Sequence, residues 1–443
     1  MSTIVALATP MGRSGVALIR LSGSAAREIA AAVCPGGPAW RPRRASLRTA
    51  IGSRGPIDSV LSVWMPGPRS FTGEDVVELS SHGNPVIIEL LLSALIEAGA
   101  VMARPGEFTR RALLNGRTTL LGAEALASLI AATSPAGVAL ARAGLSGATD
   151  DLSSSLAESL LDLAAELEAR LDHPGDELGY EDDAAVVAGL QAVASRAAAA
   201  ADGWRAGRIR IQGATVALIG PVNAGKSSLF NHLVGTGRAL VSPTPGTTRD
   251  VIERSVLLDG LEVRYLDTAG ERSGTHDPIE VAGIALGQQM TAEADLLLLL
   301  LPLHAPLSPD AERMLARTSG VPLVRVGTHA DQPAHPQAPA VEHAISSTTG
   351  AGIDALRAGI RQRLAQGRSG GEQLVVLSQR QHDLLRSISR HAAAAAAALD
   401  SVLGPAIAAE EVTAALERLS VLSGEDVREA VLDRLFAKFC IGK

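Results

Sequence analysis

The segment Gly220–Ser227 reads GPVNAGKS and fits the pattern G-x-x-x-x-G-K-[ST]. It follows an apolar run typical of a buried strand and precedes a segment typical of a helix, which is the context that this pattern requires. Glycines let the backbone curl so that successive N–H groups face phosphate oxygens, and the helix start adds partial positive charge. Lys226 would then reach the β- and γ-phosphates and Ser227 would ligate Mg²⁺. The segment therefore predicts a phosphate-binding loop.

Two further motifs follow this loop at the spacing of a nucleotide switch. GTTRD, residues 246–250, offers a threonine to Mg²⁺ and the γ-phosphate, and DTAG, Asp267–Gly270, ends the next apolar strand. Asp267 would hold the Mg²⁺ water shell and the Gly270 N–H would sense the γ-phosphate. The nucleotide contacts predicted from these motifs, and from the residue after the first motif, are Asn223, Ala224, Gly225, Lys226, Ser227, Ser228, Thr247, Thr248, Asp267, Thr268, Ala269 and Gly270.

Base selection rests on the segment Thr328–Asp331, which reads THAD where GTPases usually have Asn-Lys-x-Asp. Asp331 stands where a carboxylate accepts the guanine N1–H and amino hydrogens, and Thr328 is a shorter substitute for asparagine. His329 either covers the face of the base or is a surface-loop histidine. Ser346 and Ser347 end the next predicted strand, where a backbone N–H meets the guanine oxygen. We therefore predict selection of guanine over adenine.

The texture of the chain changes several times along its length. Residues 1 to about 118 mix short strands with one clear helix, and residues 120 to 206 read as long helices. From about 210 to 368, apolar strands alternate with helices, and Asp259-Gly260 marks a hairpin. Helical texture then returns, with an alanine run at 392–398 that we expect to be an exposed helix. The strands predicted for the α/β region are Thr215–Gly220, Arg254–Leu258, Leu261–Asp267, Asp295–Leu301, Pro322–Gly327 and His343–Ser346.

Composition excludes several classes of protein. At about 150 residues per domain, 443 residues suggest about three domains. A formal net charge of −7 excludes a generally basic nucleic-acid coat, and two cysteines are too few for a disulfide framework or an iron–sulfur cluster. No apolar run approaches the roughly 20 residues of a membrane span and no signal peptide is evident, so a cytoplasmic protein without a membrane partner is expected.

Four segments outside the nucleotide motifs point to one family. They are Ile4–Pro10 (IVALATP), Ser70–Asp75 (SFTGED), Arg104–Thr109 (RPGEFT) and Phe439–Lys443 (FCIGK). With the nucleotide motifs, they make the chain resemble the bacterial MnmE (TrmE) family of tRNA modification GTPases along essentially its whole length. The resemblance implies an α+β N-terminal folate-binding and dimerisation domain (1–118), an all-α helical domain in two parts (119–208 and 371–443, the latter with the CIGK tail) and an inserted α/β Ras-like P-loop G domain (209–370).

The same resemblance implies an activity and its partners. Such proteins are homodimers that work with a FAD-dependent partner, MnmG (GidA), as a heterotetramer. Together they install an aminomethyl or carboxymethylaminomethyl group at C5 of the tRNA wobble uridine. Methylene-tetrahydrofolate supplies the carbon, and K⁺-dependent GTP hydrolysis with Mg²⁺ drives the conformational cycle.

Roles for individual residues of the G domain follow by position in the matching motifs. The K⁺ ligands would be Asn223, Ser242, Thr244 and Thr247, and Thr248 would join Ser227 on Mg²⁺. Besides Lys226, the catalytic set would include Glu280, which would position the attacking water. Glu271 is a rival for that role, although a solvated loop glutamate is the simpler interpretation.

The N-terminal domain and the tail contribute the folate contacts. By position these are Arg20, Glu78, Arg117 and Lys443, with an arginine at 117 where the family has lysine. Cys440 is either a nucleophile or acid–base group near the folate, or a small apolar anchor for the last helix.

Two other functions fit parts of the sequence. A GTP-operated binding switch in ribosome or RNA assembly would share the region from 210 to 368 but has no use for the Cys440–Lys443 tail. An enzyme with a degenerate G domain would explain Thr328 and His329. A basic cluster of Arg41, Arg43, Arg44 and Arg48 offers contacts to tRNA phosphates, although a solvated loop is the simpler interpretation.

Overall fold

The structure is a computed structural model that forms two compact units. The first contains Met1–Ala127, Ser153–Ala157 and Leu416–Lys443, and the second contains Ser128–Leu152 and Glu158–Ala415. The residues that it describes are 2–172, 183–235, 251–268, 294–317, 321–365, 376–399, 404–425, 429–437, 439 and 442.

The first unit is built on a six-stranded sheet in the order β3-β4-β5-β2-β1-β6. Neighbouring strands are antiparallel except for β6, which pairs with β1 in parallel. The strands are β1 (Ile4–Leu7), β2 (Ser14–Ser22), β3 (Ser46–Gly52), β4 (Gly55–Met65), β5 (Val76–Gly83) and β6 (Val101–Met102). The helices of this unit include α1 (Ala26–Val33), α2 (Pro85–Glu97), α3 (Glu107–Leu114) and α15 (Glu429–Phe436).

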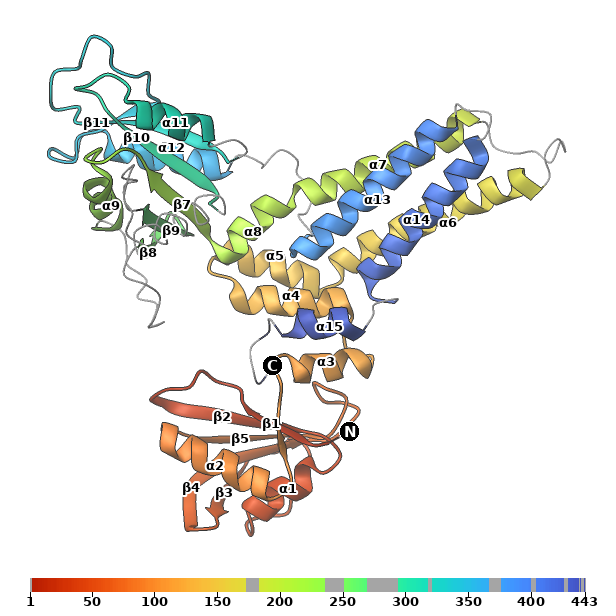
Figure 1. Cartoon of the computed structure of the whole chain (residues 1–443). Coiled ribbons are helices and arrows are strands. Elements are labelled where there is room, and N and C mark those ends of the chain that lie inside the picture. The colour runs from red at the N-terminus through yellow and green to blue at the C-terminus, as the bar shows by residue number, and fades with distance from the viewer. Residues whose placement is uncertain are drawn as a thin grey trace, which may run out of the picture. The chain divides into compact units, whose positions relative to one another are not determined.

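Alternation of side chains along β1 places a helical layer on each face of this sheet. Val5 joins the core that α1 and α2 share with one face (Figure 1), while Ile4 and Ala6 pack with Phe108 of α3 on the other. The predicted α+β character of this region is therefore confirmed.

The second unit contains another six-stranded sheet, in the order β12-β11-β10-β7-β9-β8. Its pairs are parallel except for β8 with β9. All six strands predicted for this region are confirmed, with ends displaced by no more than three residues: β7 (Ala214–Ile219), β8 (Val251–Leu258), β9 (Leu261–Thr268), β10 (Leu296–Pro302), β11 (Leu323–Thr328) and β12 (His343–Ala344). The helices on this sheet include α9 (Lys226–Gly235), α11 (Pro309–Arg317) and α12 (Ile353–Ala365).

The hairpin between β8 and β9 turns at the predicted residues. Leu258 pairs with Leu261, and the two residues between them, Asp259 and Gly260, have φ of 50° and 84°. Positive φ at both central positions suits the right-handed twist of the flanking strands and favours Asp-Gly.

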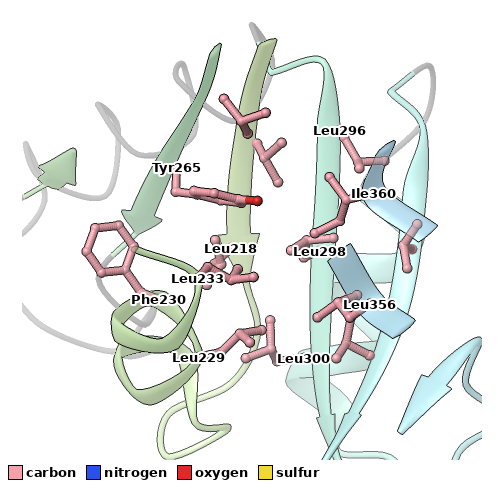
Figure 2. Close-up of a cluster of buried hydrophobic side chains, with 14 of the residues drawn as sticks. Leu218, Leu229, Phe230, Leu233, Tyr265, Leu296, Leu298, Leu300, Leu356 and Ile360 are labelled. Atoms are coloured by element: carbon pink, nitrogen blue, oxygen red, sulfur yellow. The ribbon is translucent and has the colours of Figure 1, made fainter. Parts of the chain in front are cut away.

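The core of this sheet lies between its strands and the helices α9 and α12. Leucines of β7 and β10 meet Leu229 and Phe230 from α9 and Leu356 and Ile360 from α12, with Tyr265 of β9 fully buried among them (Figure 2). This apolar layer fixes the carboxyl ends of β7, β9 and β11, from which the loops of the candidate site emerge.

The other helices among the described residues are rich in alanine and leucine, apart from the short α8. They are α4 (Leu120–Ala131), α5 (Pro135–Leu145), α6 (Ala148–Asp172), α7 (Asp183–Asp202), α8 (Trp204–Gln212), α13 (Gln379–Ala398) and α14 (Gly404–Ser423). Helix α7 packs along α13, so the helical segments on the two sides of the sheet region come together. The predicted multidomain class, with an α/β domain inserted into a helical one, is confirmed.

The alanine run at 392–398 is helical, as predicted, but it is exposed on one side only. It belongs to α13, where Ala392, Ala395 and Ala396 are buried. Small residues are also buried on α7, at Ala194 and Ala197, so the two helices pack through their alanines.

Among the described residues, one run passes a length and composition test for a membrane span. This run, Asp183–Gln212, comprises α7 and α8 and contains an 18-residue window with a mean hydropathy of 1.4. One face of α7 packs along α13 and buries Val186, Leu190 and Val193, so a single apolar run of this kind is weak evidence for a membrane span.

Helix α8 leads directly into β7 through Gly213, and this junction is tightly bonded. The buried Asp295, just before β10, accepts a hydrogen bond from the Thr215 backbone N–H at 2.9 Å and forms an ion pair with Arg208 of α8. The Arg208 guanidinium also lies 5.5 Å from the ring centre of Trp204. The helix is therefore fastened to the strand whose far end carries the phosphate-loop motif.

Candidate functional site

The phosphate-loop motif leaves the carboxyl end of β7 and turns into α9. Its backbone has positive φ at Gly220 (155°), Asn223 (63°) and Gly225 (89°). A Cβ at position 220 would lie 2.7 Å from the carbonyl oxygen of Leu300, so the close approach to β10 requires glycine there. Ala224 is fully buried, whereas Ser227 and Ser228 lie exposed in the first turn of α9.

Lys226, Ser227 and Asp267 meet at this loop. Lys226 is 8% exposed, and its Nζ donates hydrogen bonds of 2.9 Å to the carbonyl oxygens of Gly220 and Pro221. Asp267 lies near the end of the adjacent strand β9 and accepts a hydrogen bond from the Ser227 side chain. The structure thus brings the predicted phosphate and Mg²⁺ groups to one point.

Burial shifts both charged groups toward their neutral forms. It lowers the pKa of Lys226, against the opposing attraction of Asp267. It raises the pKa of Asp267 more than the Ser227 hydrogen bond and the Lys226 charge lower it. A bound anion would therefore stabilise the charged form of Lys226, and a bound divalent cation would stabilise the charged form of Asp267.

The predicted base-selection segment lies beside the phosphate loop. Thr328 is buried at the end of β11, and its side chain lies 3.8 Å from the position that a Cβ would take on Gly225. Its Oγ1 is 3.1 Å from Nδ1 of His329, whose backbone is left-handed at a φ of 59°. Two loops from β7 and β11 therefore converge at the carboxyl edge of the parallel strands, where ligands bind in sheets of this kind.

Asp331 is exposed and is oriented by the next loop. A hydrogen bond from the Ser346 side chain lowers the pKa of Asp331, so the carboxylate is ionised at neutral pH. Ser346 itself is buried, while the carbonyl oxygen of Ser347 contacts Nε2 of His232 at 2.5 Å. Asp331 thus presents its two carboxylate oxygens to solvent as hydrogen-bond acceptors.

In the first unit, Arg20 and Glu78 face each other across β2 and β5. They are cross-strand partners, with Arg20 Nη2 2.7 Å and Nε 2.9 Å from Glu78 Oε1. Arg20 also donates to the carbonyl oxygen of Gly442, next to the predicted tail residues, at 3.2 Å. Its guanidinium lies 5.7 Å from the ring centre of Phe71. Two predicted folate contacts are therefore one ion pair beside an aromatic ring.

Arg117, between α3 and α4, contacts the loop that carries that ring. Its Nε donates to the Ser70 carbonyl oxygen at 3.3 Å, and its side chain packs within 3.2 Å of the position that a Cβ would take on Gly73. The loop at 70–73 thus touches both predicted arginines.

Comparisons with known proteins agree along the whole chain. The family model described as "GTP-binding protein TrmE N-terminus" matches residues 3–117, and the one described as "MnmE helical domain" matches residues 120–440. The chain belongs to the MnmE family. Proteins named "tRNA modification GTPase MnmE" from Myxococcus xanthus and Alkalilimnicola ehrlichii are 42% and 39% identical, over 100% of this chain and 99% of each relative.

Several residues predicted from the MnmE family resemblance lie outside the described residues. These are Ser242, Thr244, Thr247, Thr248, Ala269, Gly270, Glu271, Glu280, Cys440 and Lys443, and of Thr268 only the backbone is described.

Two motifs that carry the MnmE family resemblance meet in a buried ion network that sequence reasoning missed. Arg111 is nearly buried and pairs with Glu74 at 3.0 Å and with Glu107 at 2.9 Å. Glu74 comes from the SFTGED motif and Glu107 from the RPGEFT motif, and Glu107 also accepts a hydrogen bond from the Arg104 backbone N–H at 2.8 Å. The motifs therefore attach α3 to the sheet. The acidic residue in each motif, Glu74 or Glu107, was the signal in the sequence that a buried cation could lie between the two motifs.

The basic cluster at 41–48 is not a uniformly solvated loop. Arg48 is buried, stacks at 4.0 Å on the ring of Trp40, and donates to the Ser62 hydroxyl at 3.0 Å. Nearby, burial raises the pKa of the Cys34 thiol to about 11. In this MnmE family member, both Arg48 and Cys34 therefore have packing roles.

Proposed function

We propose that this protein is a GTP hydrolase that acts in tRNA modification. The observation that carries the proposal is the convergence of Lys226, Ser227, Asp267 and Asp331 at one sheet edge, in a chain 42% identical to a tRNA modification GTPase. Each of these groups has the chemistry that one part of Mg²⁺·GTP requires.

The nucleotide would be held from both ends. Backbone N–H groups from Asn223 to Ser228 and the ammonium of Lys226 bind the phosphates, while Asp331 accepts the guanine N1–H and amino hydrogens. The phosphate charge offsets the desolvation of Lys226, which now donates only to two loop carbonyl oxygens. Ser347 offers its backbone N–H to the guanine oxygen, since the Ser346 N–H already donates to the Ala351 carbonyl oxygen at 3.0 Å.

Two cations belong to this proposal. Ser227 and Asp267 fit Mg²⁺ because they are hydrogen-bonded to each other and supply only oxygen atoms. Thr248 would join Ser227 as a ligand. Asn223, with Ser242, Thr244 and Thr247, would hold K⁺. The charge of this ion would stabilise the negative charge that develops near the β,γ-bridging oxygen during hydrolysis. Glu280 would orient the attacking water.

The first unit is proposed to bind methylene-tetrahydrofolate. The Arg20–Glu78 pair offers a carboxylate to the donor edge of a pterin and a cation to the glutamate tail, next to the Phe71 ring. Arg117 and Lys443 would add cationic contacts, and Cys440 would supply a nucleophilic or acid–base thiol. We further propose a cytoplasmic homodimer that joins a FAD-dependent MnmG (GidA) partner as a heterotetramer and installs the (carboxymethyl)aminomethyl group at C5 of the tRNA wobble uridine.

GTP turnover in K⁺ and in Na⁺ at equal ionic strength tests the central proposal. With Mg²⁺ present, we expect fast turnover only in K⁺, and we expect Asn223→Ala to turn over slowly in both salts. Val222→Ala is the matched control because Val222 is the exposed neighbour of Asn223 in the same loop. Absence of GTP turnover under every condition would refute a GTP hydrolase, and equally slow turnover in both salts would refute the K⁺ site alone. Normal turnover by Glu280→Ala would transfer the water-orienting role to Glu271 or another group.

Folate binding separates the proposal from a GTP-operated binding switch in ribosome or RNA assembly. We expect tetrahydrofolate to bind the full chain, and we expect Arg20→Ala and Glu78→Gln to weaken binding strongly. Arg104→Ala, an exposed arginine of the same unit, is the control. A GTPase that binds no folate would favour the switch.

A further inference from the structure

A second imidazole lies against His329 in the base-selection segment. His304 follows β10, and its ring centre is 4.8 Å from that of His329, with an angle of 89° between the planes. This edge-to-face arrangement is a favoured geometry for aromatic rings. Two histidines from different loops therefore form one pair.

The backbone holds His304 in this place. The N–H of its neighbour Leu303 donates to the Thr328 carbonyl oxygen at 3.0 Å, and the Leu303 carbonyl oxygen accepts from the His335 N–H at 2.9 Å. A Cβ on Gly327 would lie 2.8 Å from the Leu303 side chain, so that side chain fills the space beside β11. The loop after β10 is thus fastened to the end of β11.

His329 is also restrained on its other sides. Its Nδ1 lies 3.1 Å from Oγ1 of Thr328, and its Cε1 lies 3.9 Å from the position of a Cβ on Gly225. Its carbonyl oxygen accepts a hydrogen bond from the Gln332 N–H at 3.0 Å, which closes the turn that carries Asp331. The ring therefore lies between the phosphate loop and the turn that presents the carboxylate.

We infer that His329 packs against the face of the guanine base, and that His304 is a positioning residue that fixes the His329 ring. This inference rests on the guanine nucleotide site proposed above. Asp331 would form hydrogen bonds with the edge of the base and so select guanine. A ring that packs on the face of the base would add affinity without contacting the exocyclic groups. The imidazole pair thus replaces the lysine of the usual Asn-Lys-x-Asp motif with a ring that needs support from a second loop.

The test measures KM for GTP and for ITP, together with Kd for a fluorescent GDP analogue, in the full chain. We expect His329→Ala and His304→Ala to raise all three by about fivefold, the range of one aromatic contact. The values of kcat should stay within about twofold. His329→Lys and His304→Phe should restore binding, because each replaces the lost packing. His335→Ala is the control, since this neighbouring imidazole accepts a bond from the Gln337 N–H instead of facing His329.

A double variant separates positioning from direct contact. If His304 acts through His329, then the His304→Ala, His329→Ala double variant binds no worse than His329→Ala alone. Additive losses, an unchanged Kd in either single variant, or an equal loss in His335→Ala would overturn the inference. These outcomes differ from failure of the proposed function, which would show as an absence of GTP turnover in the unaltered protein.

Discussion

Asp331 shows how a single exposed side chain can select a base. The Ser346 hydrogen bond keeps it ionised and oriented. We expect Asp331→Asn to lower GTP affinity by at least about tenfold, because hydrogen bonds to a charged group are worth ~1.5–3 kcal/mol. The same change should move preference toward xanthine nucleotides, since the new amide donates to the second xanthine oxygen. Competition binding with GDP and XDP measures this, with Asp310→Asn, a half-exposed aspartate of α11 that pairs with Arg313, as control. Unchanged preference would contradict the role of Asp331.

The ionised Asp267 side chain should lower the stability of the folded protein, although Mg²⁺ binding requires it. Its pKa is raised in the folded state, so the folded protein binds more protons than the unfolded one between the ordinary and the raised value. Stability therefore falls as pH rises through that window, and the ionised carboxylate is destabilising at neutral pH.

Removing that charge gives the corresponding prediction. Without nucleotide, Asp267→Asn should raise the Tm at pH 7, because it removes a partly buried charge, and the gain should disappear at acid pH. It should also abolish stabilisation by Mg²⁺ with a GTP analogue. A lower Tm at neutral pH would show that the charge stabilises the site.

At this scale, local motifs sufficed for some residues of the candidate site and failed for others. Lys226 and Ser227 share a contiguous loop, so a pattern could place them. Arg111 could not be predicted, because its partner Glu74 is 37 positions away and only the folded sheet brings them together. His304 was missed for the same reason, since nothing in the sequence around it indicates its contact with His329.

Among the elements, α3 depends on one buried arginine. Arg111→Ala would leave Glu74 and Glu107 with an unpaired charge in a mostly buried place. Breaking a buried ion pair in this way typically costs ~3–5 kcal/mol. We expect a loss of that size in urea unfolding of the first unit, against a change within about 0.5 kcal/mol for the exposed Arg104→Ala. A loss below about 1 kcal/mol would mean that water solvates the two carboxylates.

The elements of the α/β region were predictable because each buried parallel strand is a short apolar run between turn signals. The strand β3 (Ser46–Gly52) was missed because its hydrophobic pattern is inverted, with Leu47 and Ile51 exposed and Arg48 buried. The alanine run of α13 was correctly placed in a helix, but one face of it is buried at Ala392, Ala395 and Ala396. Alanine adds little apolar area, so composition does not show that small residues permit close helix packing.

For the whole molecule, the two compact units should respond to different ligands. A ligand that binds only the folded state raises the stability of the unit that holds it. Mg²⁺ with a GTP analogue should therefore raise the melting transition of the unit with β7–β12, and tetrahydrofolate that of the unit with β1–β6. Calorimetry with Lys226→Ala and Glu78→Gln, each removing one response, checks the assignment. A single transition that moves with both ligands would show that the units unfold together.

Helical segments before and after a region of alternating strands and helices predicted an inserted α/β region. The family resemblance supplied the expected domain boundaries. Spacing could not show that helical segments on either side of that region pack together. The contact between α7 and α13 joins residues about 200 positions apart, and only the complete fold specifies such a pairing.

The junction of α8 with β7 also supplies a built-in optical probe. Trp204 is one of three tryptophans, and the other two, Trp40 and Trp64, lie in the first unit. Its indole lies 5.3 Å from the His382 ring and beside Arg208, which ties α8 to Asp295. With Trp40 and Trp64 replaced by phenylalanine, the remaining fluorescence would come from a point one strand away from the phosphate loop. Changes at the nucleotide site could then be followed in real time without attaching a dye.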